Sequence, residues 1–242
     1  MNRQKFVTFV FTMAVWGALL AASPVAQAGP PLICHPIDIG QAKSLPWTSD
    51  TWHLSGKESY DLNRLVEDTA TLLVPGVPVL VRMETLRRAT LYAQKDPEVS
   101  KKLLWKLRSR ALEAEGKGHP DALAWFDLGY LVECYKQANW DYVRLPSGGQ
   151  EKRTKPNPAM NMNGYAWVSK ALSMRGNDPE MEFAAALITL EGPPEQHRQH
   201  VQKALAGAKS NPLLAANLKG RFIGENSPTM AELLDKKETA KK

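Results

Sequence analysis

The sequence has little cysteine, little net charge and no second long hydrophobic run after its first 28 residues. Two cysteines in 242 residues exclude a small disulfide-stabilised fold. A hydrophobic content of 43% excludes a chain too polar to build a core, and the length suffices for one large domain or two small ones. The formal net charge of +6 is too small and too scattered to favour a nucleic-acid-binding protein.

Known catalytic motifs are also absent. The sequence has no G-x-S-x-G turn, no H-E-x-x-H motif, no P-loop and no dinucleotide-binding glycine motif. The pair Cys34-His35 lacks the second cysteine of a haem-attachment motif. The sequence therefore predicts no cofactor and no catalytic residues of a known type. An enzyme whose site residues are scattered along the sequence and match no known motif is one hypothesis, the third after the two functional hypotheses given below.

The first 28 residues have the features of a secretory signal peptide. Arg3 and Lys5 precede an uncharged apolar run from Phe6 to Ala22, and Ala26-Gln27-Ala28 supplies the small residues of a cleavage site. The alternative is an uncleaved membrane anchor, for which the run is at the short end of what spans a bilayer. We expect cleavage, which leaves 29 basic and 25 acidic residues. The mature protein is then periplasmic or secreted, without stable membrane insertion.

Proline content and hydrophobic periodicity divide the rest of the chain. Residues 29–56 contain four prolines and two tryptophans, which predicts an extended arm. From 57 to 224, apolar residues recur at helical spacing, and a polar insertion lies at about 139–163. Residues 225–242 predict a short helix beginning at Ser227 and Pro228, followed by a Lys-rich tail. We expect helices over residues 62–73, 78–93, 97–115, 120–137, 164–174, 179–190, 194–209 and 212–218.

A spacing of 33 residues recurs in the second half of the chain. It separates Lys170-Ala171-Leu172 from Lys203-Ala204-Leu205, and it also separates Pro179 from Pro212. A small alanine lets two helices approach, and the later proline begins the next helix after a short turn. We therefore expect Ala171 and Ala204 to occupy equivalent tight contacts between helices.

One helical segment carries a family motif. Trp125, Leu128 and Gly129 match W-x2-L-G, so the chain resembles tetratricopeptide-type repeats, although Val132 stands where the family prefers Tyr. The resemblance covers roughly residues 80–220. It implies an all-α array of antiparallel helix pairs, in which Gly129 admits the partner helix and a concave surface is presented to a peptide or protein. The first functional hypothesis is therefore a non-enzymatic exported scaffold that binds a peptide, a protein or a cell-envelope component.

The two cysteines suggest a covalent attachment of the arm. A bridge between Cys34 and Cys134 would close a loop of about 100 residues, worth about 4–5 kcal/mol in the chain-entropy model. The alternative is two separate thiols, with Cys134 as a small core residue. An even cysteine count in an oxidising compartment favours the bridge.

Tryptophans beside loops are the candidates for binding a partner. Trp47, Trp52 and Trp140 flank predicted loops, whereas Trp105 and Trp125 have helical spacing and apolar neighbours and are more simply core residues.

A periplasmic metal-binding protein is the second functional hypothesis. His197 and His200 fall on one face of a predicted helix, and Met160 and Met162 offer thioethers suited to copper(I). The simpler interpretation is two solvated histidines on a helix surface and an ordinary loop pair of methionines.

Overall fold

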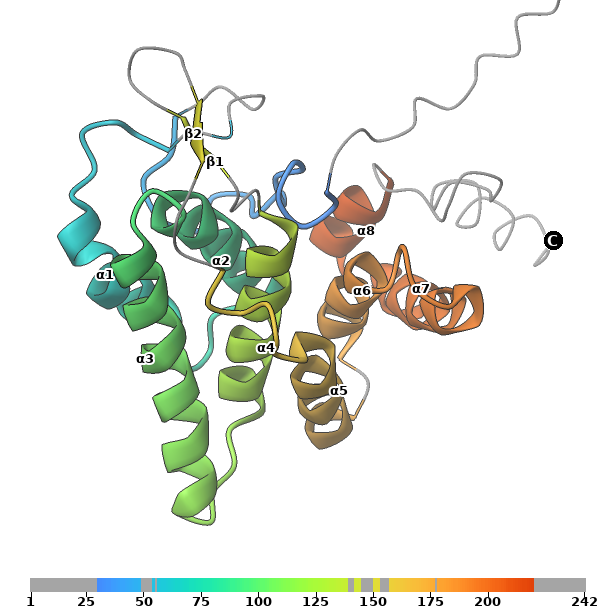
Figure 1. The fold of residues 1–242 in the computed structure, drawn as a ribbon. Coiled ribbons are helices and arrows are strands. Elements are labelled where there is room, and N and C mark those ends of the chain that lie inside the picture. Colours follow the sequence, from blue (N-terminus) through green and yellow to red (C-terminus); the bar gives the residue numbers. More distant parts are fainter. Residues whose placement is uncertain are drawn as a thin grey trace, which may run out of the picture.

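The computed structural model describes residues 30–48, 54, 56–138, 157–176 and 178–219, together with the backbone of 142–144 and 150–152. This part of the chain is all-α except for one short hairpin (Figure 1). Its elements are a 3₁₀-helix (Leu62–Arg64), α1 (Leu65–Leu72), α2 (Val79–Ala93), α3 (Pro97–Gly116), α4 (Ala122–Gln137), β1 (Tyr142–Arg144), β2 (Gln150–Lys152), α5 (Gly164–Arg175), α6 (Pro179–Ile188), α7 (Pro194–Ala208) and α8 (Pro212–Lys219).

Aspartate and proline define where several of these helices begin. Asp96, Asp121 and Asp178 are N-caps whose side chains accept hydrogen bonds from backbone N–H groups of the following turn. Helices α3, α6 and α7 have proline in the first turn, where its missing N–H would have no partner inside the helix. These local signals explain where α3, α4, α6 and α7 begin, and every helix predicted within the described ranges is present.

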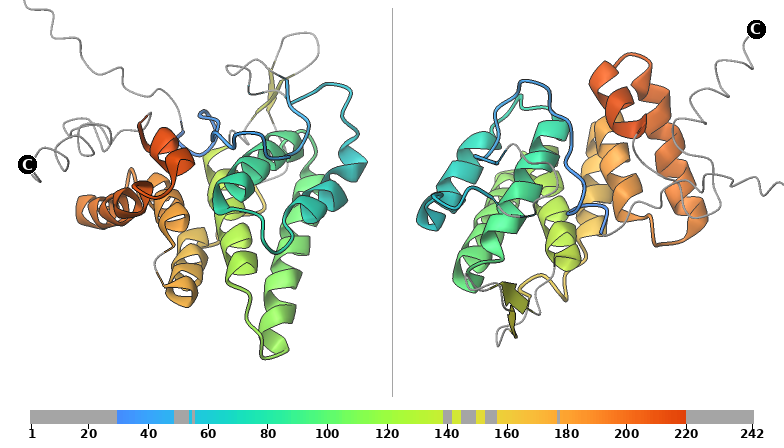
Figure 2. Two further views of the ribbon diagram at one scale, coloured as in Figure 1. Left: turned by 180° about the vertical axis from the view of Figure 1, so that it is seen from behind. Right: turned by 90° about the horizontal axis from the view of Figure 1, so that it is seen from above.

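Helix α4 is the centre of the fold. It contacts α2, α3, α5 and α6, and most of its side chains are buried, including Trp125, Phe126 and Tyr130. Figures 1 and 2 show α1–α3 on one side of α4 and α5–α8 on the other. Because α4 is covered on so many sides, its apolar residues are distributed around the whole helix.

Small residues allow close helix contacts on the α5–α8 side. A Cβ added to Gly129 on α4 would lie only 2.6 Å from the carbonyl oxygen of Gly164 on α5. On α7, a Cβ at Gly207 would clash with the Pro179 ring at the start of α6. Ala171 and Ala204 are both fully buried. The glycine of the W-x2-L-G motif therefore does lie at a close approach between two helices.

The segment 30–48 contains turns but neither helix nor strand, and it packs on the domain. Its buried side chains include Leu32, Ile33, Ile37 and Leu45. The Leu32 N–H donates to the side-chain oxygen of Gln137, at the end of α4, over 2.8 Å.

Three charged residues of α2, here called the arm clamp (Glu84, Arg87 and Arg88), hold this segment. The Glu84 carboxylate accepts hydrogen bonds from the Ile37 N–H at 3.0 Å and from both arginines at 2.7–2.8 Å. The arginines in turn donate to the carbonyl oxygens of Ile33 at 3.0 Å and Leu45 at 2.7 Å. Because the segment has no regular structure, these side chains satisfy backbone groups that would otherwise be buried without partners.

The predicted bridge between Cys34 and Cys134 is not formed, because both cysteines are free. Cys134 is buried on α4 and faces the side chain of Thr90, and burial raises the pKa of its thiol far above the usual range. Burial also raises the pKa of the Cys34 thiol, against the opposing charge of Arg87. The segment 30–48 is held by the hydrogen bonds of the arm clamp and Gln137 in place of a covalent link.

The polar insertion contains the hairpin, which the sequence patterns did not indicate. Strands β1 and β2 pair antiparallel with Val143 opposite Glu151. The predicted signal peptide (1–28) and the predicted helix at Ser227 lie outside the described residues. Within the described part, no helix is long and apolar enough to cross a membrane.

Candidate functional site

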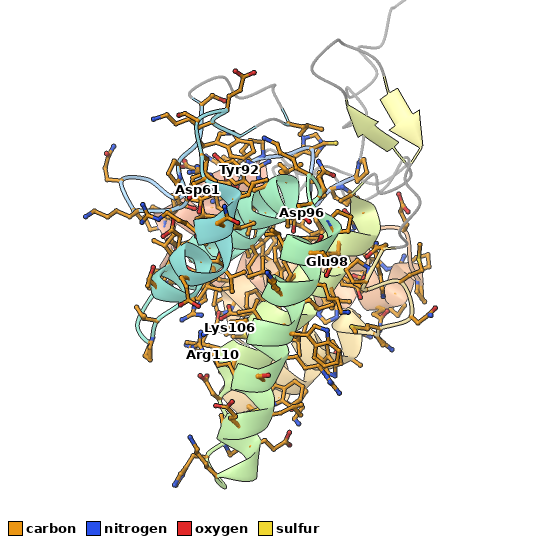
Figure 3. All side chains as sticks on the ribbon, turned by 60° about the vertical axis from the view of Figure 1, so that its left-hand side comes forward. Asp61, Tyr92, Asp96, Glu98, Lys106 and Arg110 are labelled. Atoms are coloured by element: carbon orange, nitrogen blue, oxygen red, sulfur yellow. The ribbon has the colours of Figure 1, made fainter. Side chains whose placement is uncertain are left out.

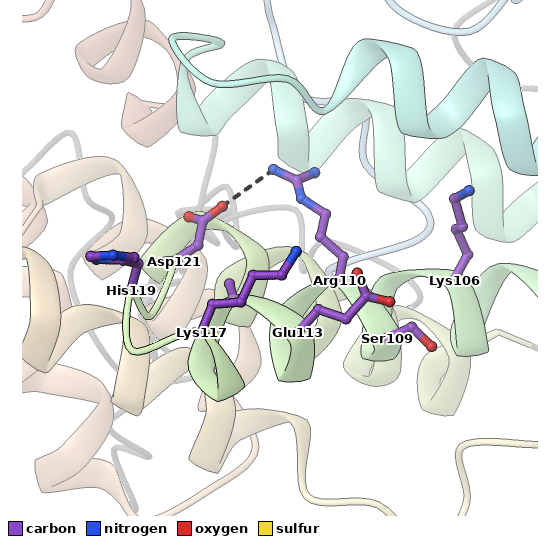
Figure 4. A pocket seen from close by; sticks show the side chains of 8 residues that line it. Lys106, Ser109, Arg110, Glu113, Lys117, His119 and Asp121 are labelled. Atoms are coloured by element: carbon purple, nitrogen blue, oxygen red, sulfur yellow. Dashed lines mark hydrogen bonds and ion pairs between the residues drawn. The ribbon is translucent and has the colours of Figure 1, made fainter.

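A groove runs between α3, the end of α1 and the turn that follows α1. It consists of a polar hollow of about 580 Å³ and a more apolar hollow of about 370 Å³. The two share Lys106, Arg110 and Asp121 in their linings and are therefore adjacent. We call this surface the α1–α3 groove. Figure 3 shows Lys106 and Arg110 on the side of α3 that faces α1, and Figure 4 shows the polar hollow from close by.

Arg110 joins the walls of the groove. Its Nη1 donates to the carbonyl oxygen of Leu73, at the end of α1, over 2.6 Å. Its Nη2 lies 3.4 Å from Asp121 Oδ2, the contact drawn in Figure 4. The other oxygen of Asp121 caps α4 by accepting from the N–H groups of Leu123 and Ala124. One guanidinium group thus links α1, α3 and the start of α4.

A fully buried ion pair lies beneath the groove. Arg82 Nη1 is 2.6 Å from Asp127 Oδ2, and both side chains are completely inaccessible. Arg82 also donates to the carbonyl oxygens of Val74 and Val77, in the turn after α1. Arg110 Nη1 is 3.6 Å from the same carboxylate oxygen of Asp127. The turn that forms one wall of the groove is therefore held from below by arginine.

Asp127 is only half satisfied in this pair. Its Oδ1 is buried and has no hydrogen-bond partner in the described part of the chain. Loss of solvation raises the pKa of Asp127 to about 6, although the positive charges of Arg82 and Arg110 oppose the shift. Buried polar atoms without partners are rare in folded proteins and are found more often at functional sites than in ordinary cores.

The polar end of the groove carries positive charge that is available to a ligand. The polar hollow is lined by three basic side chains, Lys106, Arg110 and Lys117, against two acidic ones, Glu113 and Asp121. Lys117 and His119, which line the polar hollow, have no ion-pair partner among the described residues. Lys106 lies 3.4 Å from Glu67, and both side chains are at least half exposed, so solvent weakens this pair. The polar end is therefore suited to a negatively charged group.

The apolar end of the groove is formed by the end of α1 and the turn after it. Ala70, Leu73, Val74 and Pro75 line it together with Leu107 of α3. Val74 is 46% exposed, so this wall presents an accessible apolar side chain beside the basic residues. A ligand that fills the whole groove needs both apolar and acidic groups.

The tryptophans predicted from the sequence occupy different places. Trp47 is partly buried in the packing of the arm, with its ring 5.2 Å from the Arg87 guanidinium and 5.7 Å from the ring of Tyr92. Trp52 and Trp140 lie outside the described residues, so their role in binding stays a prediction. Trp125 is buried as expected, whereas the core assignment of Trp105 is wrong: it is 45% exposed, beneath the guanidinium of Arg108.

The predicted metal ligands are placed in two surroundings. Met160 is exposed and Met162 packs against the core. His197 and His200 are buried, which overturns the interpretation that they are solvated on a helix surface. His197 Nδ1 lies 2.9 Å from the carbonyl oxygen of Ala186. Over the described ranges, no group of three or more His, Cys, Asp or Glu side chains is placed to hold a metal ion. A site built from the two methionines stays a prediction.

His200 belongs to a cluster that the sequence patterns did not indicate. Its Nδ1 is 2.5 Å from Glu182 Oε2 and its Nε2 is 2.8 Å from the hydroxyl of Tyr165. These residues come from three helices and are up to 35 positions apart, so no short motif links them. The only signal in the sequence was the histidine itself.

Comparison with known proteins adds no relative. No family model, no curated protein and no solved structure matches the chain. The fold and the groove therefore define only a class of protein: an all-α protein with a groove that is basic at one end and apolar at the other.

Proposed function

We propose that this protein is an exported helical scaffold, periplasmic or secreted, with helix pairs stacked in the manner of tetratricopeptide repeats. Its partner is a peptide or protein segment that combines apolar and acidic side chains and lies in the α1–α3 groove. The observation that carries this proposal is the adjacency of the two hollows, in which an apolar wall lies next to a basic end at Lys106, Arg110 and Asp121.

The supporting argument is one of complementarity. Apolar side chains of the ligand would cover the exposed side chain of Val74, and its carboxylates would approach Lys106 and Lys117. Arg110 is already bonded to Leu73 and Asp121, so it shapes the groove and leaves the two lysines to set the charge preference. Binding of this kind depends on shape and charge and requires no chemical step.

The proposal is tested with labelled peptides. Fluorescence anisotropy should show binding of a fluorescein-labelled peptide of alternating leucine and glutamate, and much weaker binding of leucine–lysine and serine–glutamate peptides. The double variant Lys106→Ser/Lys117→Ser should lower the affinity for the leucine–glutamate peptide about tenfold, and Val74→Ser should lower it as well.

Lys101→Ser is the matched control, because Lys101 is exposed on α3 and does not line the groove. Its affinity for the peptide should equal that of the unaltered protein. Equal binding of all three peptides, or an equal loss in the Lys101 variant, would exclude the groove as the binding site.

A further inference from the structure

A second hollow, remote from the groove, lies between α5, α6 and α7. Its volume is about 390 Å³, within the range of small-molecule sites. Three helices contribute its polar groups: Tyr165 and Ser169 from α5, Glu182 from α6, and His200 and Lys203 from α7. We call it the His200 pocket.

The hydrogen bonds of the pocket assign the protonation of His200. Glu182 is almost completely buried, and its Oε2 lies 2.5 Å from His200 Nδ1. Burial alone would raise the pKa of Glu182, but the hydrogen bonds from His200 and Lys203 outweigh it and hold the pKa below its usual value. The ionised carboxylate only accepts, so Nδ1 carries the proton. In the neutral form of this imidazole, Nε2 has a free electron pair, which accepts the hydrogen bond from the Tyr165 hydroxyl at 2.8 Å.

This arrangement has the order carboxylate, imidazole, hydroxyl. In that order the carboxylate orients the imidazole, and the imidazole removes the proton from the hydroxyl as its oxygen attacks. A neutral phenol such as Tyr165 is a weak nucleophile. His200 Nε2 lies 2.8 Å from the Tyr165 hydroxyl and can take its proton during the attack, so a phenolate does not have to form first.

The pocket also holds hydrogen-bond donors for an oxyanion. Ser169 lies one helical turn after Tyr165, and its Oγ is buried without a hydrogen-bond partner among the described residues. Lys203 Nζ lies 3.1 Å from Glu182 Oε1, and half of its side chain is exposed. Leu172 supplies an apolar wall. A buried donor without a partner is costly unless a ligand supplies the acceptor.

We propose that the His200 pocket is an acyl-transfer site for small carboxylic esters, with Tyr165 as nucleophile and His200 as general base. Tyr165 Oη attacks the ester carbonyl carbon while its proton passes to His200 Nε2. The C–O bond to the alcohol then breaks, and the leaving oxygen takes the proton from His200. Tyr165 is left as an acyl ester.

Water completes the cycle. It attacks the acyl-tyrosine while His200 Nε2 takes one of its protons, and that proton passes to Oη of Tyr165 as the acid leaves. The net reaction is ester plus water to carboxylic acid plus alcohol. Ser169 Oγ–H and Lys203 Nζ donate to the carbonyl oxygen as its negative charge develops. Glu182 is a positioning residue that acts through His200.

The experiment uses 4-nitrophenyl acetate with the full mature chain. We expect a burst of 4-nitrophenolate and acetyl-Tyr165 in the digested protein, identified by mass spectrometry. Tyr165→Phe should abolish the burst. His200→Ala should slow it at least a hundredfold, and added imidazole should restore part of the rate. In Glu182→Gln, the ¹⁵N NMR signals of His200 should change from the Nδ1-protonated form to a mixture of tautomers.

Tyr60→Phe is the matched control, because the Tyr60 hydroxyl donates to Asp68 at 2.8 Å and faces no imidazole in the described structure. Its burst should equal that of the unaltered protein, and circular dichroism should confirm that each variant is folded. The proposal is overturned if Tyr165 is acetylated no faster than Tyr60, if His200→Ala leaves the rate unchanged, or if Ser169 carries the acetyl group.

Discussion

The two sides of helix α4 are held together by different forces. On the α1–α3 side, hydrogen bonds from arginine side chains to backbone carbonyl oxygens join distant segments: the arm clamp holds residues 30–48, and Arg82 and Arg110 hold the turn after α1. On the α5–α8 side, glycines and alanines let helices touch, as at Gly129 and Gly164. Charged contacts depend on pH and on every partner being present, whereas close contacts between small residues depend only on shape.

The α1–α3 side also contains a comparison between two buried carboxylates. Glu84 accepts four hydrogen bonds, from Ile37, Arg87 and Arg88. Burial alone would raise its pKa, but these donors outweigh burial and hold the pKa below its usual value. Among the described residues, Asp127 accepts one hydrogen bond at Oδ2 and none at Oδ1, and burial raises its pKa to about 6. The number of hydrogen-bond donors to each carboxylate therefore decides whether burial raises its pKa or is outweighed.

The largest effect should follow from removing the charge of Glu84. Glu84→Gln leaves Arg87 buried and Arg88 partly buried without their counter-ion, so the free energy of unfolding should fall by about 3–5 kcal/mol. Urea denaturation measures this loss, and residues 30–48 should become more sensitive to proteolysis. Glu67→Gln is the control, because Glu67 pairs with Lys106 at the exposed surface, and its effect should stay below about 1 kcal/mol. If both variants lose the same free energy of unfolding, the arm clamp does not stabilise the fold more than the exposed Glu67–Lys106 pair does.

The next effect concerns the pH dependence of Asp127. Its pKa is about 6 in the folded protein and 3.8 ordinarily, so the folded state binds this proton more tightly. The resulting stabilisation is complete below pH 4 and is lost as the pH rises through 6, by at most about 3 kcal/mol. Asp127→Asn cannot titrate and should lack this decline.

Urea denaturation of both proteins between pH 4 and pH 7 measures the difference in slope. Glu84 should act in the opposite sense, because its lowered pKa gives stability that is lost as the pH falls below its ordinary value of 4.5. A difference between Asp127→Asn and the unaltered protein that does not change with pH would contradict the raised pKa of Asp127.

The smallest of the three effects is expected at the contact between α4 and α5. In Gly129→Ala, the new methyl group would lie 2.6 Å from the Gly164 carbonyl oxygen and 2.9 Å from the Val168 nitrogen. Both are backbone atoms, so the helices must separate, at a cost of about 1–3 kcal/mol. The loss should not vary with pH, in contrast to the effects at Glu84 and Asp127.

Gly116→Ala provides the control for this substitution. Gly116 is the last residue of α3 and has nothing within 4 Å of an added Cβ. Its replacement should leave the stability unchanged or raise it by up to about 1 kcal/mol through helix propensity. If Gly129→Ala is equally harmless, the two sides of α4 do not differ in the way described above.

The sequence alone was sufficient for the helices and for most of their boundaries. Asp96 with Pro97 and Asp178 with Pro179 are local signals that act within a single turn, so they can be recognised without knowledge of the fold. Ala171 and Ala204 are buried, as the repeated spacing led us to expect, whereas the equivalence of their helix contacts stays a prediction. Periodicity did not distinguish Trp105 from Trp125, since α3 has an open face and α4 has almost none.

Only the tertiary structure decided which side chains meet. Leu73 and Arg110 form one groove although they are 37 positions apart, and Tyr165, Glu182 and His200 come together from three helices. The even cysteine count favoured a bridge, but the polar contacts of residues 30–48 hold that segment and leave both thiols free. Helix formation depends on neighbours along the chain, which the sequence displays. Grooves and clusters depend on how helices pack, and packing is decided by contacts between residues that no local pattern connects.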